Sequence, residues 1–274
     1  MRSRSAPEPS RSLRFLYGTT VGRLLLKPLV QPGLSRAAGW LLSQRVSRCL
    51  IAPFVRRSGI DLGDYLPEDY GSYNEFFCRR IRPELRPLSS AALVSPCDGR
   101  ASAYPITDDL RLTVKHTIYS VSSLLQNEAL ARQFAGGTAL ILRLAVDDYH
   151  RYCFPLDGTV RETGTIPGRF HTVQPIGNDQ YLIYKENARQ YTVLHSDKLG
   201  AVAMVEVGAL LVGRIVNHPL TGTVCRGQEK GYFQFGGSTI VLLLQKHVSL
   251  PQEFFRNTAQ GWETRIYWGE SLLD

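Results

Sequence analysis

The chain has 274 residues, of which 43% are hydrophobic, 10% aromatic and 20% charged. This composition is typical of a folded protein, so it excludes collagen-like and low-complexity chains, and the length allows one large domain or two small ones. The longest stretch without Lys, Arg, Asp or Glu runs only from Gly231 to Gln245 and contains three glycines, whereas a membrane-spanning helix needs about 20 mostly apolar residues.

The net charge of +8 is concentrated at the N-terminus. Residues 1–60 hold 11 of the 32 Lys and Arg and one of the 24 acids, which gives +10, so residues 61–274 carry −2. A nucleic-acid-binding protein would more often spread its basic stripe over the folded domain, and we expect no nucleic-acid partner. A basic, Leu-rich leading segment favours an anionic membrane surface instead.

The five cysteines are scattered along the chain and form no C-x-x-C pair. This pattern predicts neither a disulfide framework nor a metal site. We expect reduced thiols that behave as small apolar residues in a protein facing the cytosol.

The N-terminal quarter is expected to contain a tail and two helices. Residues 1–12 are rich in Ser, Pro and Arg and are predicted to be a disordered tail. Apolar residues recur at helical spacing from Leu13 to Leu24 and again from Leu34 to Leu50, so residues 13–60 are predicted to form amphipathic helices with basic polar faces. Such helices could dock on a membrane or pack on the body as ordinary surface helices. We expect a peripheral protein on the cytoplasmic side of the cell membrane, or on an organelle membrane in a eukaryote.

Residues 61–274 are predicted to form a β-rich catalytic body. The clearest strand candidates are Ala139–Val146, Gln190–Leu194, Ala201–Val207, Ala209–Val216 and Thr239–Leu244. A helix is predicted over Leu124–Phe134, with a capping box of Ser123 and Gln126, and another near Gln252–Gln260. The predicted fold class is therefore α+β, mainly β, with amphipathic helices preceding the body.

Four segments hold residues that could carry chemistry. Taken singly, each has an ordinary structural interpretation: a turn, a surface histidine, a strand end and a bulge. The segments are Ser95–Arg100 with Asp98, Asp147–Tyr152 with His150, Phe170–Val173 with His171, and Lys230–Thr239 with its Gly-Gly-Ser-Thr corner. The last is neither a P-loop nor a G-x-S-x-G nucleophile turn.

Taken together, the order and spacing of these segments resemble the phosphatidylserine decarboxylase family. The resemblance runs from about Phe15 to the C-terminus. Its motifs are Phe76–Pro83 with Arg86-Pro87, Ser95–Gly99, Asp148–Arg151, Val207–Ala209, Val212–Ile215, Lys230–Thr239, and Trp262–Thr264 before Gly269-Glu270.

The resemblance implies a self-cleaving proenzyme. The Ser238 hydroxyl would attack the Gly237 carbonyl, and β-elimination and hydrolysis would convert Ser238 into a pyruvoyl group. The products would be a β chain of residues 1–237 and an α chain of residues 238–274, which remain together as a heterodimer. The amine of phosphatidylserine would form a Schiff base with the pyruvoyl carbonyl, which serves as the electron sink for loss of CO2, and phosphatidylethanolamine would be released.

A base must deprotonate Ser238 first. The family's Asp and His match Asp98 and His150. Family members often carry a second histidine three residues after the first, but Cys153 stands there in this chain. Either His150 performs both proton transfers or another residue, such as His171, substitutes, and the residue that protonates the carbanion is left open.

Two alternative functions follow from the same features. The chemistry could act on another serine lipid or on a soluble serine derivative, although the amphipathic N-terminal segment favours a lipid. The chain could also be a relative that no longer cleaves and only binds membranes, which the presence of Asp98, His150, Gly237, Ser238 and Thr239 disfavours.

Overall fold

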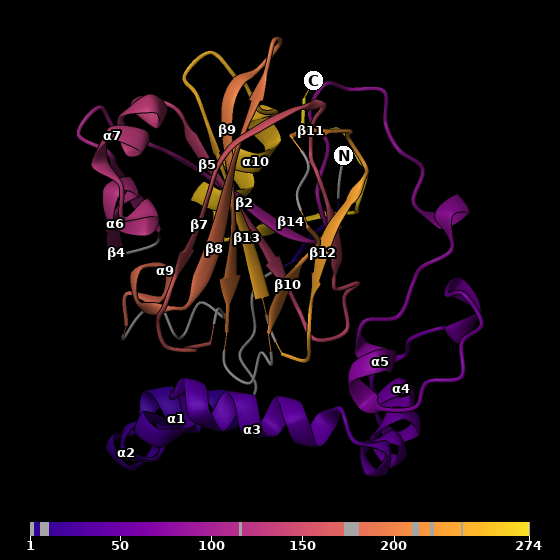
Figure 1. Ribbon diagram of the computed structural model, residues 1–274. Helices are drawn as coiled ribbons and strands as arrows, with labels where there is room; N and C mark the ends of the chain where they lie inside the picture. The colour runs from indigo at the N-terminus through magenta and orange to yellow at the C-terminus, as the bar shows by residue number, and fades with distance from the viewer. Residues whose placement is uncertain are drawn as a thin grey trace.

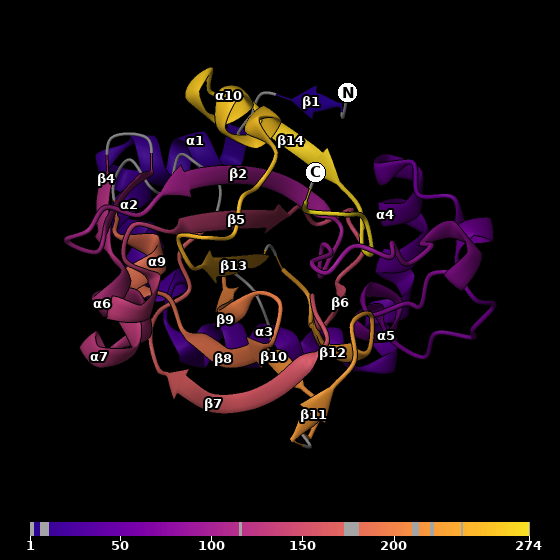
Figure 2. The same ribbon diagram turned by 90° about the horizontal axis from the view of Figure 1, so that it is seen from above.

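The computed structural model describes residues 3–5, 11–114, 117–172, 181–209, 214–219, 222–236 and 238–273. A large antiparallel sheet forms the centre of the body, as Figures 1 and 2 show from two sides. The first three helices lie across one end of that sheet, and both termini lie near the opposite end (Figure 1). The predicted class, α+β and mainly β, is confirmed.

The helices are short and lie mostly before and beside the sheet. They are α1 (Arg11–Gly18), α2 (Thr20–Leu29), α3 (Pro32–Leu42), α4 (Ile51–Ser58), α5 (Tyr73–Phe77), α6 (Val121–Leu125), α7 (Glu128–Ala131), α9 (Ile183–Glu186) and α10 (Gln252–Ala259). Short 3₁₀ helices are η1 (Arg45–Leu50), η2 (Leu62–Asp64), η3 (Pro83–Leu85) and η4 (Arg132–Phe134).

The strands form three sheets. The nine-stranded sheet has the order β1-β14-β2-β5-β13-β9-β8-β7-β11, and β10-β12-β6 and β3-β4 form two smaller sheets. Their bounds are β1 (Arg4–Ser5), β2 (Gly99–Pro105), β3 (Arg111–Val114), β4 (Thr117–Ser120), β5 (Thr138–Leu144), β6 (Arg151–Cys153), β7 (Gly158–Ile166), β8 (Arg189–Ser196), β9 (Gly200–Gly208), β10 (Ile215–Asn217), β11 (Thr223–Val224), β12 (Glu229–Phe233), β13 (Ser238–Leu244) and β14 (Glu263–Ile266).

The central strand β13 is buried along its whole length. Its apolar run has side chains alternating between two cores, with Ile240, Leu242 and Leu244 on one face and Val241 and Leu243 on the other. A strand covered on both faces needs such a continuous apolar run. One face is covered by the small β10-β12-β6 sheet and the C-terminal segment, and the other by α6, α7 and α9 (Figure 2).

Differences from the sequence-based expectations are local. The first predicted helix is divided into α1 and α2, because the Thr19 side chain caps a new helix by accepting a hydrogen bond from the Gly22 N–H at 2.9 Å. The helix predicted over Leu124–Phe134 is also interrupted. Gln126 adopts φ 51°, and the Asn127 side chain provides the N-cap instead of the predicted capping box.

Two further expectations differ from the structure. In the predicted tail, Arg4–Ser5 forms β1 and pairs with the edge strand β14, because that edge offers unpaired backbone groups; residues 6–10 lie outside the described residues. Of the strand predicted over Ala209–Val216, only β10 from Ile215 is observed, and residues 210–213 lie outside the described residues.

Candidate active site

Segments that are far apart in the sequence meet at one end of the large sheet. Ser238, the first residue of β13, pairs with Leu144 at the end of β5 and with Gly208 at the end of β9. Strand β2, which follows Asp98, begins beside the end of β5. All these pairs are antiparallel, so the starts of some strands lie beside the ends of their neighbours at one end of the sheet. We call this end of the sheet the catalytic end.

Ser238 is fully buried, and its hydroxyl makes no hydrogen bond to the described part of the chain. Two neighbouring strands hold its backbone, whereas Gly208 opposite it has no side chain to fill the space. A buried hydroxyl without a partner is costly, and such groups recur where a side chain is kept ready for reaction. Gly237, the other half of the predicted cleavage site, lies outside the described residues.

His150 is also fully buried at the catalytic end. Its Nδ1 lies 2.9 Å from the carbonyl oxygen of Asp148, which can only accept, so Nδ1 carries the ring proton. Nε2 is then an unprotonated acceptor, and it has no hydrogen-bond partner among the described residues. Burial lowers the pKa of His150 to about 4, although the charge of Asp148 and the backbone of Asp148 and Gly236 oppose that shift. At neutral pH the ring is therefore a neutral base beside the segment that leads to Ser238.

The low pKa of His150 predicts a pH-dependent stability. Between pH 6.5 and about 4 the unfolded chain binds a proton that the folded chain excludes, so stability falls as pH falls through this window. We expect the free energy of unfolding in urea to drop by about 2 to 3 kcal/mol from pH 7 to pH 4.5 on account of His150. A His150→Gln variant should lose most of this dependence, and an unchanged slope in that variant would contradict the assignment. Burial also lowers the pKa of His171, so a smaller slope should remain.

Asp98 lies at the catalytic end but does not contact His150. Its carboxylate accepts hydrogen bonds from Arg86 Nε at 2.9 Å and from the Trp268 N–H at 2.8 Å. The Arg86 pair is bidentate and Asp98 is buried, so this carboxylate fixes the C-terminal segment to the strand start. No hydrogen bond joins Asp98 to His150 within the described residues.

Asp148 is the acid that acts on His150. Burial would raise the pKa of Asp148, but Arg265, Arg100 and the Ala145 N–H outweigh it and keep the pKa below its usual range. Arg265 and Arg100 approach the carboxylate at 2.6 and 2.9 Å. The carboxylate thus holds the turn whose carbonyl accepts a hydrogen bond from His150 Nδ1–H, and its charge favours a protonated ring. Asp148 belongs to the motif Asp148–Arg151, but the sequence alone predicts no role for it.

Helix α5 supplies two site residues that the sequence analysis missed. The ring of Phe77 packs against His150 with centroids 4.1 Å apart and against Phe235 at 5.3 Å. Asn74 accepts a hydrogen bond from the Phe235 N–H at 3.1 Å and donates to the Gly39 carbonyl in α3 at 3.0 Å. Asn74 therefore ties the N-terminal helices to the segment just before Ser238. In the sequence, only the motif Phe76–Pro83 indicated that this region belongs to the site.

A buried polar network lies in the interior that Ser238 faces. Glu206 and Lys230 are both fully buried, with Oε1 and Nζ 2.9 Å apart, and Lys230 also donates to Asn217 at 2.7 Å. Burial raises the pKa of Glu206 although Lys230 opposes the shift. Lys230 occupies a bulge in β12, which turns its side chain inward. Pairing makes this burial of charge tolerable and fixes the wall of the interior.

His171 and Cys153 make other contacts. The ring of His171 stacks on Tyr181 at 4.2 Å and lies 3.5 Å from the carboxylate of Glu186. The Cys153 thiol is buried near the Ser95 carbonyl, and burial raises its pKa. The geometry favours His150 over both as the base. Within the described residues, no cluster of His, Cys, Asp or Glu could hold a metal ion.

Comparisons with known proteins give the same family over nearly the whole chain. The family model described as "Phosphatidylserine decarboxylase" matches residues 73–274. Phosphatidylserine decarboxylase proenzyme 2 of Clostridium acetobutylicum is 43% identical over 264 residues, which cover 95% of this chain and 90% of that protein. The phosphatidylserine decarboxylase proenzymes of Ruminiclostridium cellulolyticum and of Chlamydia trachomatis serovar L2 are each 38% identical, over 96% of this chain and 90% of theirs.

Proposed function

We propose, on the premise that this chain belongs to the phosphatidylserine decarboxylase family, that His150 and Ser238 carry out its self-cleavage. The chain acts as a phosphatidylserine decarboxylase, a lyase that converts phosphatidylserine to phosphatidylethanolamine and CO2. The observation that supports the assignment of residues most directly is the pair of unpartnered buried atoms, Ser238 Oγ and His150 Nε2, at the catalytic end.

In the proposed self-cleavage, His150 Nε2 accepts the proton of the Ser238 hydroxyl while Oγ attacks the Gly237 carbonyl carbon. The C–N bond between Gly237 and Ser238 breaks, and the proton passes to the departing nitrogen, so that the peptide becomes an ester. The Asp148 carbonyl keeps Nδ1–H in place, which holds the lone pair on Nε2. Asp98 has a positioning role in this proposal, since it acts through Arg86 and Trp268 rather than on the ring.

A pyruvoyl group derived from Ser238 fits the residues around it. The position is fully buried, two strands hold its backbone, and glycine lies opposite. When formed, that group supplies the carbonyl electron sink that decarboxylation of an amino acid requires. The surrounding residues exclude water and hold the new chain terminus in the sheet, because β13 is buried from Ser238 to Leu244.

The membrane surface is proposed as the place of action. Val21, Leu24 and Trp40, on α2 and α3, are 60 to 67% exposed, whereas Tyr17, Leu26 and Val30 pack inward as a small core. The helices thus have one apolar side toward the body and another toward solvent, and the basic residues of this segment suit an anionic bilayer. No helix in the described ranges is long and apolar enough to cross a membrane.

Replacing Val21, Leu24, Leu25 and Trp40 by Gln should weaken binding to vesicles of phosphatidylglycerol and phosphatidylcholine at least about tenfold, because these exposed apolar side chains would enter the interface. Sedimentation with vesicles measures this. High salt should weaken wild-type binding without abolishing it, since salt screens only the charges.

The matched control for that variant replaces four exposed apolar residues outside the helices. These residues are Leu62, Leu66, Leu85 and Ile118. The control should bind vesicles as the wild type does. Equal loss in both variants, or none in either, would contradict docking through α2 and α3.

The decarboxylase function is tested by release of labelled CO2 from phosphatidylserine labelled in its serine carboxyl group. Release from phosphoserine but not from the lipid would favour the soluble-substrate alternative. A chain that binds vesicles and never cleaves would favour the non-cleaving alternative.

A further inference from the structure

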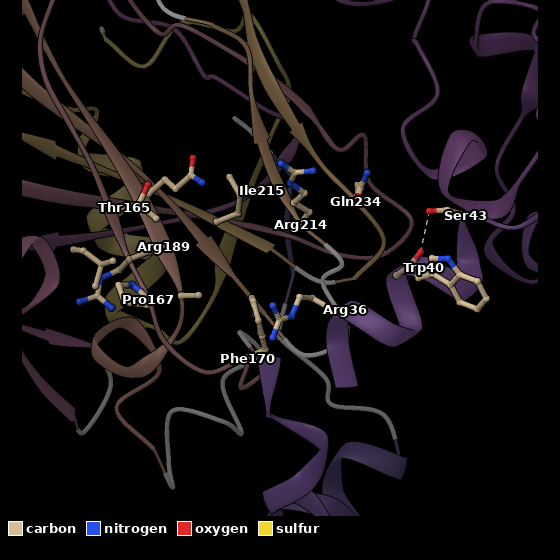
Figure 3. A pocket seen from close by; sticks show the side chains of 14 residues that line it. Arg36, Trp40, Ser43, Thr165, Pro167, Phe170, Arg189, Arg214, Ile215 and Gln234 are labelled. Carbon is tan, nitrogen blue, oxygen red and sulfur yellow. Dashed lines mark hydrogen bonds between the residues drawn. The ribbon is translucent and has the colours of Figure 1, made fainter. Parts of the chain in front are cut away.

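A cavity of about 640 Å³ separates α3 from the catalytic end (Figure 3). Its walls come from α3, from the end of β7 and the segment after it, and from the start of β8. The start of β10, with Arg214 before it, and Gln234 after β12 complete the lining. It therefore lies between the proposed membrane-docking helices and the strand ends that hold Ser238. Nothing in the self-cleavage described above uses it.

The lining of the cavity is cationic. It contains Arg36, Arg189 and Arg214 and no acidic residue in the described part of the chain. Arg36 belongs to α3 and Arg214 to the opposite wall (Figure 3). Both residues are exposed.

Arg189 carries a charge, but its guanidinium N–H groups are already hydrogen-bonded within the protein. Its guanidinium donates to the carbonyls of Ser123, Leu124, Lys185 and Asn187 at 2.7 to 2.8 Å, with no carboxylate among these partners. Burial lowers its pKa to about 10, so it stays protonated at neutral pH. Backbone carbonyls rather than a carboxylate therefore surround the Arg189 guanidinium in the described part of the chain.

Two contacts connect the cavity to the reacting residue. Phe170, in its wall, lies so near β9 that a Cβ on Gly208 would be 2.8 Å from its ring, and Gly208 pairs with Ser238. Within the wall itself, the Gln234 N–H donates a hydrogen bond to the Arg214 carbonyl at 3.0 Å. Asn74 links the Gly39 carbonyl of α3 to Phe235, three residues before Ser238.

The outer rim of the cavity is apolar. Trp40, which lines it, is 67% exposed, and Leu41 beside it is 53% exposed. A ligand bound here would have an anionic part between the arginines and an apolar part toward the surface on which α3 lies. A phospholipid has this combination, whereas a soluble phosphate ester has only the first part.

We propose that this cavity binds the phosphodiester of the serine lipid between Arg36 and Arg214, so that the serine end of the headgroup reaches the catalytic end. Guanidinium groups bind phosphate oxygens through paired, charge-assisted hydrogen bonds. The assignment rests on the proposed lipid substrate and adds the residues that recognise it. It makes α3 a wall of the substrate site as well as a membrane contact.

The test uses the processed enzyme and phosphatidylserine in non-ionic detergent micelles, which removes the charge of the bilayer. Arg36→Gln and Arg214→Gln should each raise KM about tenfold, and kcat should change less than about threefold, because the lost contact lies on a part of the substrate that does not react. Arg57→Gln, which removes an exposed charge on α4 outside the cavity, is the matched control and should behave as the wild type. Self-cleavage should be complete in every variant.

A direct binding measurement tests the headgroup site independently of the decarboxylase activity. Glycerophosphoserine should bind the wild type by calorimetry and bind the double variant at least about tenfold more weakly. Equal binding of inorganic phosphate would overturn the assignment to a lipid headgroup. Arginine-dependent binding without CO2 release would support the site and reject the decarboxylase function, whereas CO2 release with an unchanged KM in the double variant would overturn the site and leave the function.

Discussion

A His150→Ala chain is expected to remain a single uncleaved polypeptide. Ser238 Oγ would then lack the neutral base that the Asp148 carbonyl holds in the correct tautomer. Removal of the histidine from serine hydrolases costs several orders of magnitude in rate, and we expect cleavage to slow by at least about 10³-fold. Denaturing electrophoresis of samples taken over time measures the fraction cleaved.

His171→Ala is the matched control for that variant. His171 is also buried, and burial also lowers its pKa, but its ring lies against Tyr181 and Glu186. Its loss should leave cleavage at a rate close to that of the wild type. If the His171 variant stays uncleaved while the His150 variant is processed, the two roles must be exchanged.

Conversion of Ser238 to Ala should abolish both self-cleavage and decarboxylation. The wild-type chain should separate into residues 1–237 and 238–274, and the smaller chain should have a blocked N-terminus because a pyruvoyl group carries no free amine. The Ser238→Ala chain lacks the nucleophile, so it should keep its full mass and release no labelled CO2. Mass spectrometry of the intact protein measures the first effect.

Thr239→Val controls for the loss of a buried hydroxyl at this corner. Thr239 Oγ1, like Ser238 Oγ, is buried without a hydrogen-bond partner among the described residues. Strand alternation directs it to the other face of β13, so its removal should leave cleavage intact within about tenfold. An active wild-type protein that remains one polypeptide would contradict the proposed cleavage altogether.

The strands could be predicted from the sequence because burial imposes a local pattern. The mostly apolar runs at β5, β9 and β13 are bounded by turn residues, and each is a strand in the structure within about two residues. The breaks at Thr19 and Gln126 were missed because a single side-chain cap or one left-handed residue outweighs the helical spacing around it.

The amphipathic helices illustrate a pattern that has two causes. Spacing indicated which residues of α1 to α3 are apolar, but not which apolar side contacts the protein. Tyr17 is buried, and its hydroxyl accepts a hydrogen bond from the Thr172 N–H at 2.8 Å, whereas Val21, four residues later, is exposed. Only the position of the helices against the sheet end separates the inward residues from those available to a membrane.

The sequence by itself determined the family and the chemistry that family performs, and it predicted the residues for that chemistry: a serine after two glycines, a histidine after a buried strand and an aspartate at a turn. The partners of those residues were decided only by the tertiary structure. Antiparallel pairing brings Ser238, Leu144 and Gly208 to one edge although about 60 residues separate β5 from β9. Electrostatic and hydrogen-bond partners depend on distances across such pairings. For that reason Asp148 rather than Asp98 contacts His150, and Asn74 and Phe77 of α5 contact Phe235 and His150.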